Sequence, residues 1–233
     1  MTTGAFTSFT LAIAVGDSKL PENLDHILLG CNDLDNGIAY MERLSGYRAA
    51  FGGSHPGRGT HNAILKMEPH SYLEIIAPDP QQKELVWHSD LATLSEPLLV
   101  GYAVPQSNLE AYAASLRAKR VACAGPIAGS RARPDGQLLR WQTLSYQDDR
   151  NGLLPFFIDW DPHSPHPSSD APGALSLISF TRTGQLLEEA TLPPGKHKQL
   201  LPDQPVQLHL RLKGLYGEFE LVSKSIPSET WVS

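Results

Sequence analysis

Two apolar segments of the sequence each contain one side chain that can bind a metal ion or transfer a proton. His26 lies in LDHILLG, and Glu74 lies in SYLEIIA. Side chains alternate between the two faces of a strand, so each of these groups points to the face opposite its apolar neighbours. A buried ionisable group must be paired, hydrogen-bonded or metal-bound. Because both segments contain one, we predict that His26 and Glu74 belong to a single site.

The glycine-rich stretch GGSHPGRGTHNAIL lies between these segments and adds further polar groups. Its glycines permit backbone turns and the close approach of a ligand. Arg58 offers a planar fork for a carboxylate or phosphate, and Thr60 and Asn62 offer neutral hydrogen bonds. The stretch is not a Walker loop, because the terminal Gly-Lys-Ser/Thr is absent. Arg58, Thr60 and Asn62 are therefore predicted to bind substrate, whereas the glycines serve equally well in a simple tight turn.

The residues around His26 and Glu74 form one predicted unit of a strand, a helix and three strands. DHILLGC is a predicted strand, Asp33 caps a predicted helix with apolar residues at helical spacing, and Gly46 lies just beyond its end. Further strands are predicted at 47–51, 62–67 and 72–77, with the glycine-rich loop before the second and the turn EPHS before the third. This βαβββ unit closes near Pro78.

The same order of elements recurs later in the chain. PLLVGYAV is a predicted strand, Ser107 and Glu110 form a capping box before a helix, and strands follow near 121–124, near 137–144 and in LLPFFIDW. A proline- and serine-rich segment, 161–173, precedes strands that resemble a third, degenerate copy without a helix. The predicted organisation is an N-terminal segment 1–23, a first module 24–78, a second module 98–160 and a degenerate C-terminal module 174–223.

Composition and charge argue against several classes of function. The chain has 233 residues, of which 41% are hydrophobic and 19% charged, as in a soluble globular protein. A net charge of −6 without a Lys/Arg cluster argues against a nucleic-acid partner. The apolar run TSFTLAIAV is too short to span a bilayer, and Cys31 and Cys123 support neither a disulfide framework nor a cysteine zinc site. We expect a cytoplasmic protein with a small-molecule ligand and no membrane partner.

The duplicated βαβββ order, with His on the first strand and Glu on the fourth, resembles the vicinal-oxygen-chelate superfamily of glyoxalase I and the extradiol dioxygenases. LDHILLGCNDLDNGIAYMERLSGY, HPGRGTHNAIL, YLEIIAPDP, LLRWQTL and LPFFIDW look like the glyoxalase-like family of bacterial proteins. HPGRGTHNA is the most specific of these pieces. The resemblance implies an α+β fold in which paired modules form a cup-shaped mixed sheet around a small-molecule site. It does not fix a reaction, because one fold hosts many chemistries.

The resemblance also implies that His26 and Glu74 project into the cup, where an imidazole and a carboxylate suit a divalent metal such as Zn, Mn, Fe or Ni. A metal there would polarise a carbonyl, and Glu74 is alternatively the proton-transferring base. The second module departs from the family pattern. Val100 or Gly101 stands where a second histidine is expected, and Phe156 or Phe157 stands where a second carboxylate is expected. Two side chains are too few for a catalytic zinc ion.

A third metal ligand must come from elsewhere, and His55 is the better of two candidates. If EPHS closes a hairpin, Glu74 pairs with Leu65, which places His61 on the same face but about 13 Å away along the strand. His55 lies in the glycine-rich loop, which can fold back over the cup. His26, His55 and Glu74 would then form a two-histidine, one-carboxylate set.

Aromatic and basic residues of the second module are predicted to complete the pocket. Arg140, Trp141 and Trp160 offer a stacking and charged surface, although the tryptophans also suit a core. Two hypotheses follow: a metal-assisted isomerase or lyase acting on a small oxygenated metabolite, or a metal-free protein that binds a small anionic or aromatic ligand. The resemblance also favours a homodimer, because the superfamily often completes its cups by pairing.

Overall fold

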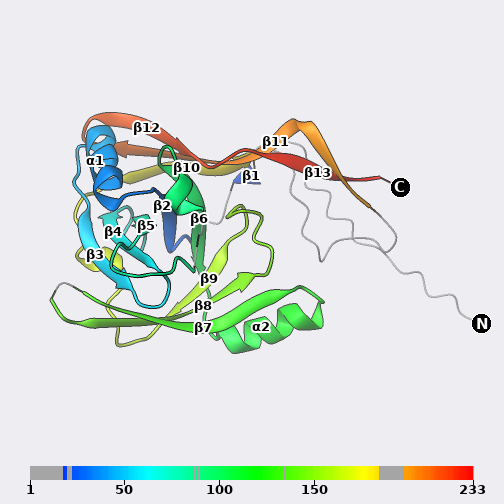
Figure 1. The fold of residues 1–233 in the computed structure, drawn as a ribbon, viewed down its shortest axis with the longest axis horizontal. Helices are drawn as coiled ribbons and strands as arrows, with labels where there is room; N and C mark the ends of the chain where they lie inside the picture. Colours follow the sequence, from blue (N-terminus) through cyan, green and yellow to red (C-terminus); the bar gives the residue numbers. More distant parts are fainter. Residues whose placement is uncertain are drawn as a thin grey trace, which may run out of the picture.

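One curled mixed sheet of eight strands forms the body of the molecule (Figure 1). The protein is represented by a computed structural model, which describes residues 18–19, 23–86, 88, 90–133, 135–183 and 197–232. Most of the predicted N-terminal segment therefore lies outside the described residues. No helix among the described residues is both long and apolar enough to cross a membrane.

Each half of the eight-stranded sheet follows the predicted order of a strand, a helix and three strands. The first half comprises β2 (His26–Gly30), α1 (Leu34–Ser45), β3 (Ala50–His55), β4 (Thr60–Lys66) and β5 (Tyr72–Pro78). The second comprises β6 (Leu98–Pro105), α2 (Leu109–Ala118), β7 (Cys123–Ala132), β8 (Leu138–Tyr146) and β9 (Phe156–Trp160). Short 3-10 turns lie at Leu91–Thr93 and Pro167–Ser169.

The two halves join side by side through their first strands. The sheet order is β3-β4-β5-β2-β6-β9-β8-β7; β2 pairs with β6 antiparallel, and each of them pairs with its own last strand in parallel. The sheet curls until its two edge strands approach each other. A Cβ added at Gly53 on β3 would lie 2.6 Å from the carbonyl oxygen of Ala132 on β7. The predicted α+β class and the cup-shaped mixed sheet are confirmed.

The first helix begins and ends where its sequence dictates. The side chain of Asp33 accepts a hydrogen bond from the Asn36 amide, and Gly46 adopts the left-handed conformation, with φ of 79°, that favours glycine. The predicted capping box of the second helix is wrong. Asn108 rather than Ser107 is the cap: its side chain accepts from the Ala111 amide, and its φ of 53° is one that asparagine tolerates better than most residues.

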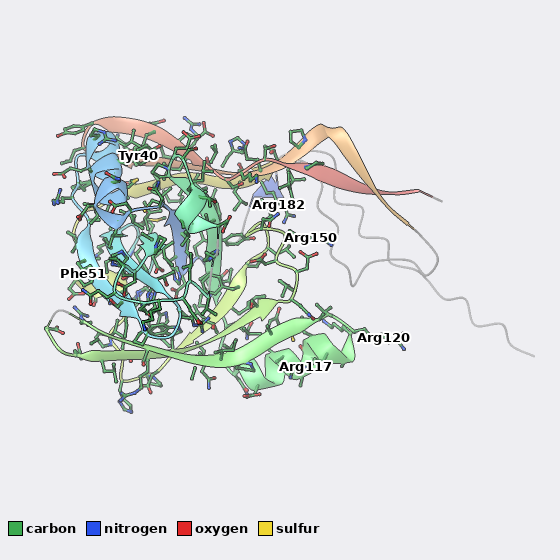
Figure 2. All side chains as sticks on the ribbon, viewed as in Figure 1. Tyr40, Phe51, Arg117, Arg120, Arg150 and Arg182 are labelled. Carbon is green, nitrogen blue, oxygen red and sulfur yellow. The ribbon has the colours of Figure 1, made fainter. Side chains whose placement is uncertain are left out.

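Strand alternation divides the side chains of β2 and β5 between a core and the inside of the cup. Ile27, Leu29, Leu73 and Ile75 pack with α1 and with leucines of the C-terminal strands in one continuous core. The alternate positions face the concave side. A second core lies between α2 and the outer face of β8 and β9. In Figure 2, Tyr40 and Phe51 mark the first half of the molecule, and Arg117 and Arg120 mark the outer end of the second.

The C-terminal strands form a separate antiparallel sheet over the first half (Figure 1). It comprises β10 (Ser176–Thr183), β11 (His197–Gly214), β12 (Gly217–Val222) and β13 (Ile226–Val232), with β1 (Ser18–Lys19) at the edge. The described part of this region contains no helix. Val206, Leu208 and Leu210 are fully buried, so this sheet closes the core rather than forming another cup.

The strand predicted at 47–51 is displaced towards the glycine-rich stretch. It runs from Ala50 to His55, and the next strand already begins at Thr60. The expected long loop is therefore a short turn between two paired strands. His55 and Thr60 face each other across that turn.

Candidate active site

The cup contains a cavity of about 230 Å³. Both halves of the sheet line it: His26, His55 and Glu74 from the first half, and Trp141, Phe156 and Trp160 from the second. Histidines and a carboxylate thus come from the first half, and most of the large aromatic rings come from the second. Such a combination of apolar walls and a few convergent polar groups is typical of a small-molecule site.

His26 and Glu74 converge in this cavity, as the alternation of side chains predicts. The parallel pairing of β2 with β5 places Leu28 beside Glu74 and His26 beside Tyr72, so all four side chains share a face. Nε2 of His26 lies 3.4 Å from Oε2 of Glu74, and both residues are buried. The His26 ring stacks on Tyr72 with ring centroids 4.7 Å apart. Burial of Tyr72 raises the pKa of its hydroxyl well above 10.

His55 joins them from the end of β3, not from a flexible loop. Its Nδ1 is hydrogen-bonded to Oγ1 of Thr60 at 2.9 Å, and its Nε2 lies 3.8 Å from Oε1 of Glu74. Burial lowers the pKa of His55 to about 4, although the charge of Glu74 opposes that shift. His55 is therefore neutral at pH 7. Thr60 orients His55 instead of contacting a ligand directly.

The predicted register of the hairpin between β4 and β5 is wrong by one residue. Glu74 pairs with Ile64 rather than with Leu65. Because a shift of one residue exchanges the two faces of a strand, Asn62 shares the face of Glu74 and His61 does not. Nδ2 of Asn62 donates to Oε1 of Glu74 at 2.8 Å. Asn62 therefore holds the carboxylate in place from inside the cavity.

A buried carboxylate that the sequence analysis overlooked lies behind His26. Asp25 accepts from Nδ1 of His26 at 2.6 Å and from Nε1 of Trp160 at 2.9 Å, and its Oδ2 lies 3.3 Å from Nε2 of His166. Burial alone would raise the pKa of Asp25, but the hydrogen bonds from the two histidines hold it well below its usual range. His166, which comes from the proline- and serine-rich segment 161–173, is thus part of this network.

The glycine-rich turn has a structural role as well as a position beside the cavity. The amides of Gly57 and Gly59 both donate to Oε1 of Gln82, at 3.0 and 3.2 Å, so they are not directed at a ligand. A Cβ at Gly59 would lie 1.9 Å from the carbonyl oxygen of Glu84. The half-buried Arg58 lines the cavity, and burial lowers its pKa.

Trp141 and Trp160 line the cavity, but Arg140 does not. The two indoles pair across β8 and β9, with ring centroids 5.4 Å apart. Arg140 is the neighbour of Trp141 on the strand, so its side chain takes the other face and is exposed in a shallow outer hollow. Trp141, Trp160 and Arg58 also line this hollow, so the binding role of Arg140 beside the tryptophans stays a prediction.

The second half supplies no histidine or carboxylate at the positions where the family pattern expects them. Val100, Gly101 and Phe156 line the cavity. Phe157 points to the opposite side, where its ring packs against Tyr112 of α2 with centroids 4.8 Å apart. The rings of Phe156 and His26 meet in a T-shaped arrangement, with centroids 5.4 Å apart. This wall therefore shapes the cavity with apolar surface.

Tyr72, His88 and Arg131 also line the cavity, and none of the three was identified from the sequence. Tyr72 lies two residues before Glu74, so the two-residue period of a strand could have identified it. Burial lowers the pKa of His88. Arg131 comes from β7 of the other half, and no local sequence signal connects it to Glu74.

No preformed metal centre is present among the described residues. Within them, no group of three or more His, Cys, Asp or Glu side chains is arranged to hold a metal ion. Ligands that share a tetrahedral zinc ion lie about 3.4 Å apart. The separation between His26 and Glu74, 3.4 Å, matches this value, whereas that between His55 and Glu74, 3.8 Å, exceeds it. The donor types suit a metal, but the three residues do not form a ligand set in this arrangement.

Comparisons with known proteins identify a family and a fold. The family model described as a glyoxalase-like domain matches residues 24–191. A search of curated proteins finds no match. A hypothetical protein from Staphylococcus aureus is 16% identical, with a TM-score of 0.53 over 88% of this chain and 87% of that chain. This likeness shows the fold alone.

Methylmalonyl-CoA epimerases are also among the similar solved structures. A variant of the Streptomyces coelicolor enzyme, in complex with 2-nitronate-propionyl-CoA, is 20% identical, with a TM-score of 0.46 over 61% of this chain and 97% of that chain. The enzyme from Mycobacterium tuberculosis is 18% identical, with a TM-score of 0.44 over 67% of this chain and 95% of that chain.

Proposed function

The chain belongs to the family of glyoxalase-like domains, and from that premise we propose that it is an enzyme that moves a proton on a small oxygenated metabolite, in an isomerase or lyase reaction. The observation that carries this proposal is the surroundings of the Glu74 carboxylate. Asn62 donates to one oxygen, and the Nε2 atom of His26 faces the other at 3.4 Å, inside a cavity of about 230 Å³. A carboxylate fixed in this way suits the removal of a proton next to a carbonyl group.

Glu74 is the proposed base. The C–H bond of the substrate breaks, its proton goes to Oε2 of Glu74, and the electron pair forms the double bond of an enolate, whose oxygen takes the negative charge. Return of that proton from Glu74 to the same carbon, after the enolate has turned its other face to the carboxyl group, re-forms the carbonyl and completes an isomerisation that inverts this carbon. Departure of a leaving group from the adjacent carbon with its bonding electron pair, as the enolate re-forms the carbonyl and a carbon–carbon double bond, completes a lysis. His26 orients Glu74, because the buried, ionised Asp25 holds its Nδ1 and so directs its Nε2 towards the carboxylate.

We also propose, as a second candidate, that a divalent metal (Zn, Mn, Fe or Ni) binds to His26, His55 and Glu74. The observation that favours it is that both rings turn Nε2 towards Glu74 while a buried partner, Asp25 or Thr60, holds Nδ1. Partners of this kind orient the histidines of metal sites. A bound metal would supply a Lewis acid for the substrate oxygen. Binding requires the His55 ring or the carboxylate to move inward.

The alternative to both candidates is a metal-free protein that only binds a small molecule. The apolar positions Val100, Gly101 and Phe156 and the paired indoles of Trp141 and Trp160 favour it, because they make a ligand pocket without catalytic groups. A protein of this kind would bind its ligand without exchanging any proton.

Solvent deuterium exchange tests the proton transfer directly. Untagged protein in D₂O is incubated with a panel of α-keto acids and 2-hydroxy acids, and proton NMR follows the exchange of their α-hydrogens. We expect exchange of at least one compound and a loss of about 100-fold or more in Glu74→Gln. His61→Ala is the matched control, because His61 lies on the opposite face of the hairpin. Equal exchange by Glu74→Gln and the parent protein would overturn the proposal.

Metal analysis of the same untagged protein tests the second candidate. Near-stoichiometric metal that is lost in both His26→Ala and Glu74→Ala, but kept in His61→Ala, supports the ligand set. Unchanged metal content in the first two variants contradicts it. Ligand-induced thermal stabilisation that persists in chelator, without deuterium exchange, would instead favour the binding protein.

Three features stay predictions from the sequence: the cytoplasmic location, the homodimer and the boundaries of the modules.

A further inference from the structure

Arg131 is a buried cation inside the proposed active site, and its charge is not explained by the fold. It lies near the end of β7, is 4% exposed and lines the same cavity as Glu74. Its Nη1 donates to the carbonyl oxygen of Gly52 on β3, so one of its five N–H donors links the two edge strands. Within the described part of the chain, this is the only hydrogen bond of its side chain, and no ion pair joins it to a carboxylate.

A buried guanidinium group without an ion-pair partner is expected to bind an anion. Burial lowers the pKa of Arg131, although interactions with Tyr72 and Glu74 oppose that shift. Removing a charge from water without a partner is costly, whereas a paired and hydrogen-bonded charge is tolerated. Fixing β7 to β3 would require only a neutral donor. The charge is therefore available for a ligand that enters the cavity.

Asn62 supplies a second, independent sign of a ligand. Asn62 is 2% exposed, and its Nδ2 is committed to Glu74 at 2.8 Å. Its Oδ1 is buried and has no hydrogen-bond partner in the described structure. A buried acceptor without a partner costs about 1–3 kcal/mol, so this oxygen requires a donor.

The unpaired oxygen and the guanidinium lie beside each other. A Cβ added at Gly52 would stand 2.3 Å from Oδ1 of Asn62 and 3.4 Å from Nη2 of Arg131. A molecule that satisfies both groups must therefore carry its negative charge and its hydrogen-bond donor close together. Glu74 lies on the Nδ2 side of Asn62 and repels the charged end of the molecule. The uncharged carbon atoms of the molecule therefore lie next to Glu74.

We infer that the substrate is a small hydroxycarboxylate, whose carboxylate binds Arg131 and whose hydroxyl group donates to Oδ1 of Asn62. This inference rests on the proposed function for the position of the reacting carbon beside Glu74, but the binding itself is independent of turnover. Arg131 is thus a specificity-determining residue that the second half of the sheet contributes to the catalytic wall of the first.

Binding of matched compounds tests the inference without any assay of catalysis. The series comprises 2-hydroxy acids of two to six carbons, the acids that lack the hydroxyl group, and the amides of the hydroxy acids. Dissociation constants come from isothermal titration calorimetry, after a thermal-shift screen. For at least one chain length we expect the hydroxy acid to bind at least about tenfold more tightly than its amide and than its deoxy analogue. The first factor is that of a hydrogen bond to a charged group, and the second is the cost of leaving the buried oxygen of Asn62 without a donor. No preference for acid over amide at any length would overturn the role of Arg131, and no preference for hydroxy over deoxy acid would overturn that of Asn62.

Variants assign the preferences to residues. Arg131→Gln should abolish the preference for acid over amide, and Arg131→Lys should retain part of it, because it keeps the charge. Arg133→Gln is the matched control: Arg133 lies two residues further along and pairs with Asp135 and Asp170. A purely structural Arg131 predicts the opposite result, with lower thermal stability in Arg131→Gln but unchanged ratios of the dissociation constants. If Arg131→Gln does not fold, equal ratios in Arg131→Lys and in Arg131→Met would equally contradict the inference.

If hydroxy acids bind with these preferences but show no deuterium exchange, the inference stands and the proposed proton transfer fails. If exchange occurs on compounds that lack a carboxylate, the proposed function stands and the inference fails.

Discussion

The Asp25 network allows a quantitative prediction for Asp25→Asn. The native carboxylate is 3% exposed and lies within hydrogen-bonding distance of His26, Trp160 and His166, at 2.6, 2.9 and 3.3 Å. Asparagine has nearly the same shape, but it presents an NH₂ group to at least one of these donors and removes the negative charge. Each hydrogen bond to a charged group contributes about 1.5–3 kcal/mol. We therefore expect a loss of about 3 kcal/mol in the free energy of unfolding at pH 7.

The pH dependence of this loss provides a second, independent check. The histidines lower the pKa of Asp25 in the folded protein, so its carboxylate stabilises the fold above the unfolded-state pKa of about 3.9. That stabilisation disappears as the pH falls further, towards the folded-state pKa. The difference between the parent protein and Asp25→Asn should therefore be constant down to about pH 4 and shrink below it.

Urea unfolding followed by tryptophan fluorescence measures both effects. A loss of about 3 kcal/mol corresponds to a decrease of about 6–12 °C in the melting temperature for a protein of this size. Asp135→Asn is the control, because Asp135 is exposed and its pair with Arg133 is an open one at 3.6 Å; it should cost less than about 1 kcal/mol. The reasoning is refuted if Asp25→Asn costs no more than the control, or if its cost is as large at pH 3 as at pH 7.

Three further predictions concern the residues that surround the cavity. Gly59→Ala should destabilise the protein by several kcal/mol, because the new Cβ would stand 1.9 Å from a backbone carbonyl oxygen. Gly57 has a similar positive φ but no atom within 4 Å of an added Cβ, so Gly57→Ala should cost only about 1–2 kcal/mol. Equal losses of the two variants in urea unfolding would contradict this difference. His55→Gln should remove part of the dependence of the free energy of unfolding on pH. Because the pKa of His55 is about 4 in the folded protein, lowering the pH from 6.5 to 4 costs the parent protein about 3 kcal/mol through this one group. If the free energies of unfolding of His55→Gln and the parent protein change in parallel between these pH values, this reasoning is wrong. Trp160→Phe keeps an aromatic ring but removes the Nε1 donor to Asp25, so it should lower the free energy of unfolding by about 1.5–3 kcal/mol. The double variant with Asp25→Asn should lose less than the sum of the two single losses. Full additivity would show that the two residues are not coupled.

The sequence predicted the elements that have strong local signals. The first helix begins after Asp33 and stops at Gly46, because a side-chain acceptor and a left-handed glycine act within one turn of the chain. The convergence of His26 and Glu74 was also predictable. Each residue interrupts an apolar strand, and the period of a strand assigns it to the face opposite the core.

Local sequence patterns also led to predictions that were wrong by one residue. Ser107 was expected to cap the second helix because of its spacing from Glu110, but Asn108 does so. The hairpin register was displaced by one residue, and this displacement favoured Leu65 over Ile64 as the partner of Glu74. In a strand, an error of one residue exchanges inside and outside, and for this reason the importance of Asn62 could not be derived from the turn EPHS alone.

The sequence by itself therefore determined the two half-sheets, the helix caps and the face that His26 and Glu74 occupy, because these depend on interactions between residues close together in the chain. Only the tertiary structure decided which groups surround them. Trp160 and His166 meet Asp25 across more than a hundred residues, and Arg131 reaches the cavity because the curled sheet brings its two edge strands together. Such contacts depend on the curvature of the whole sheet, which no local pattern of residues encodes.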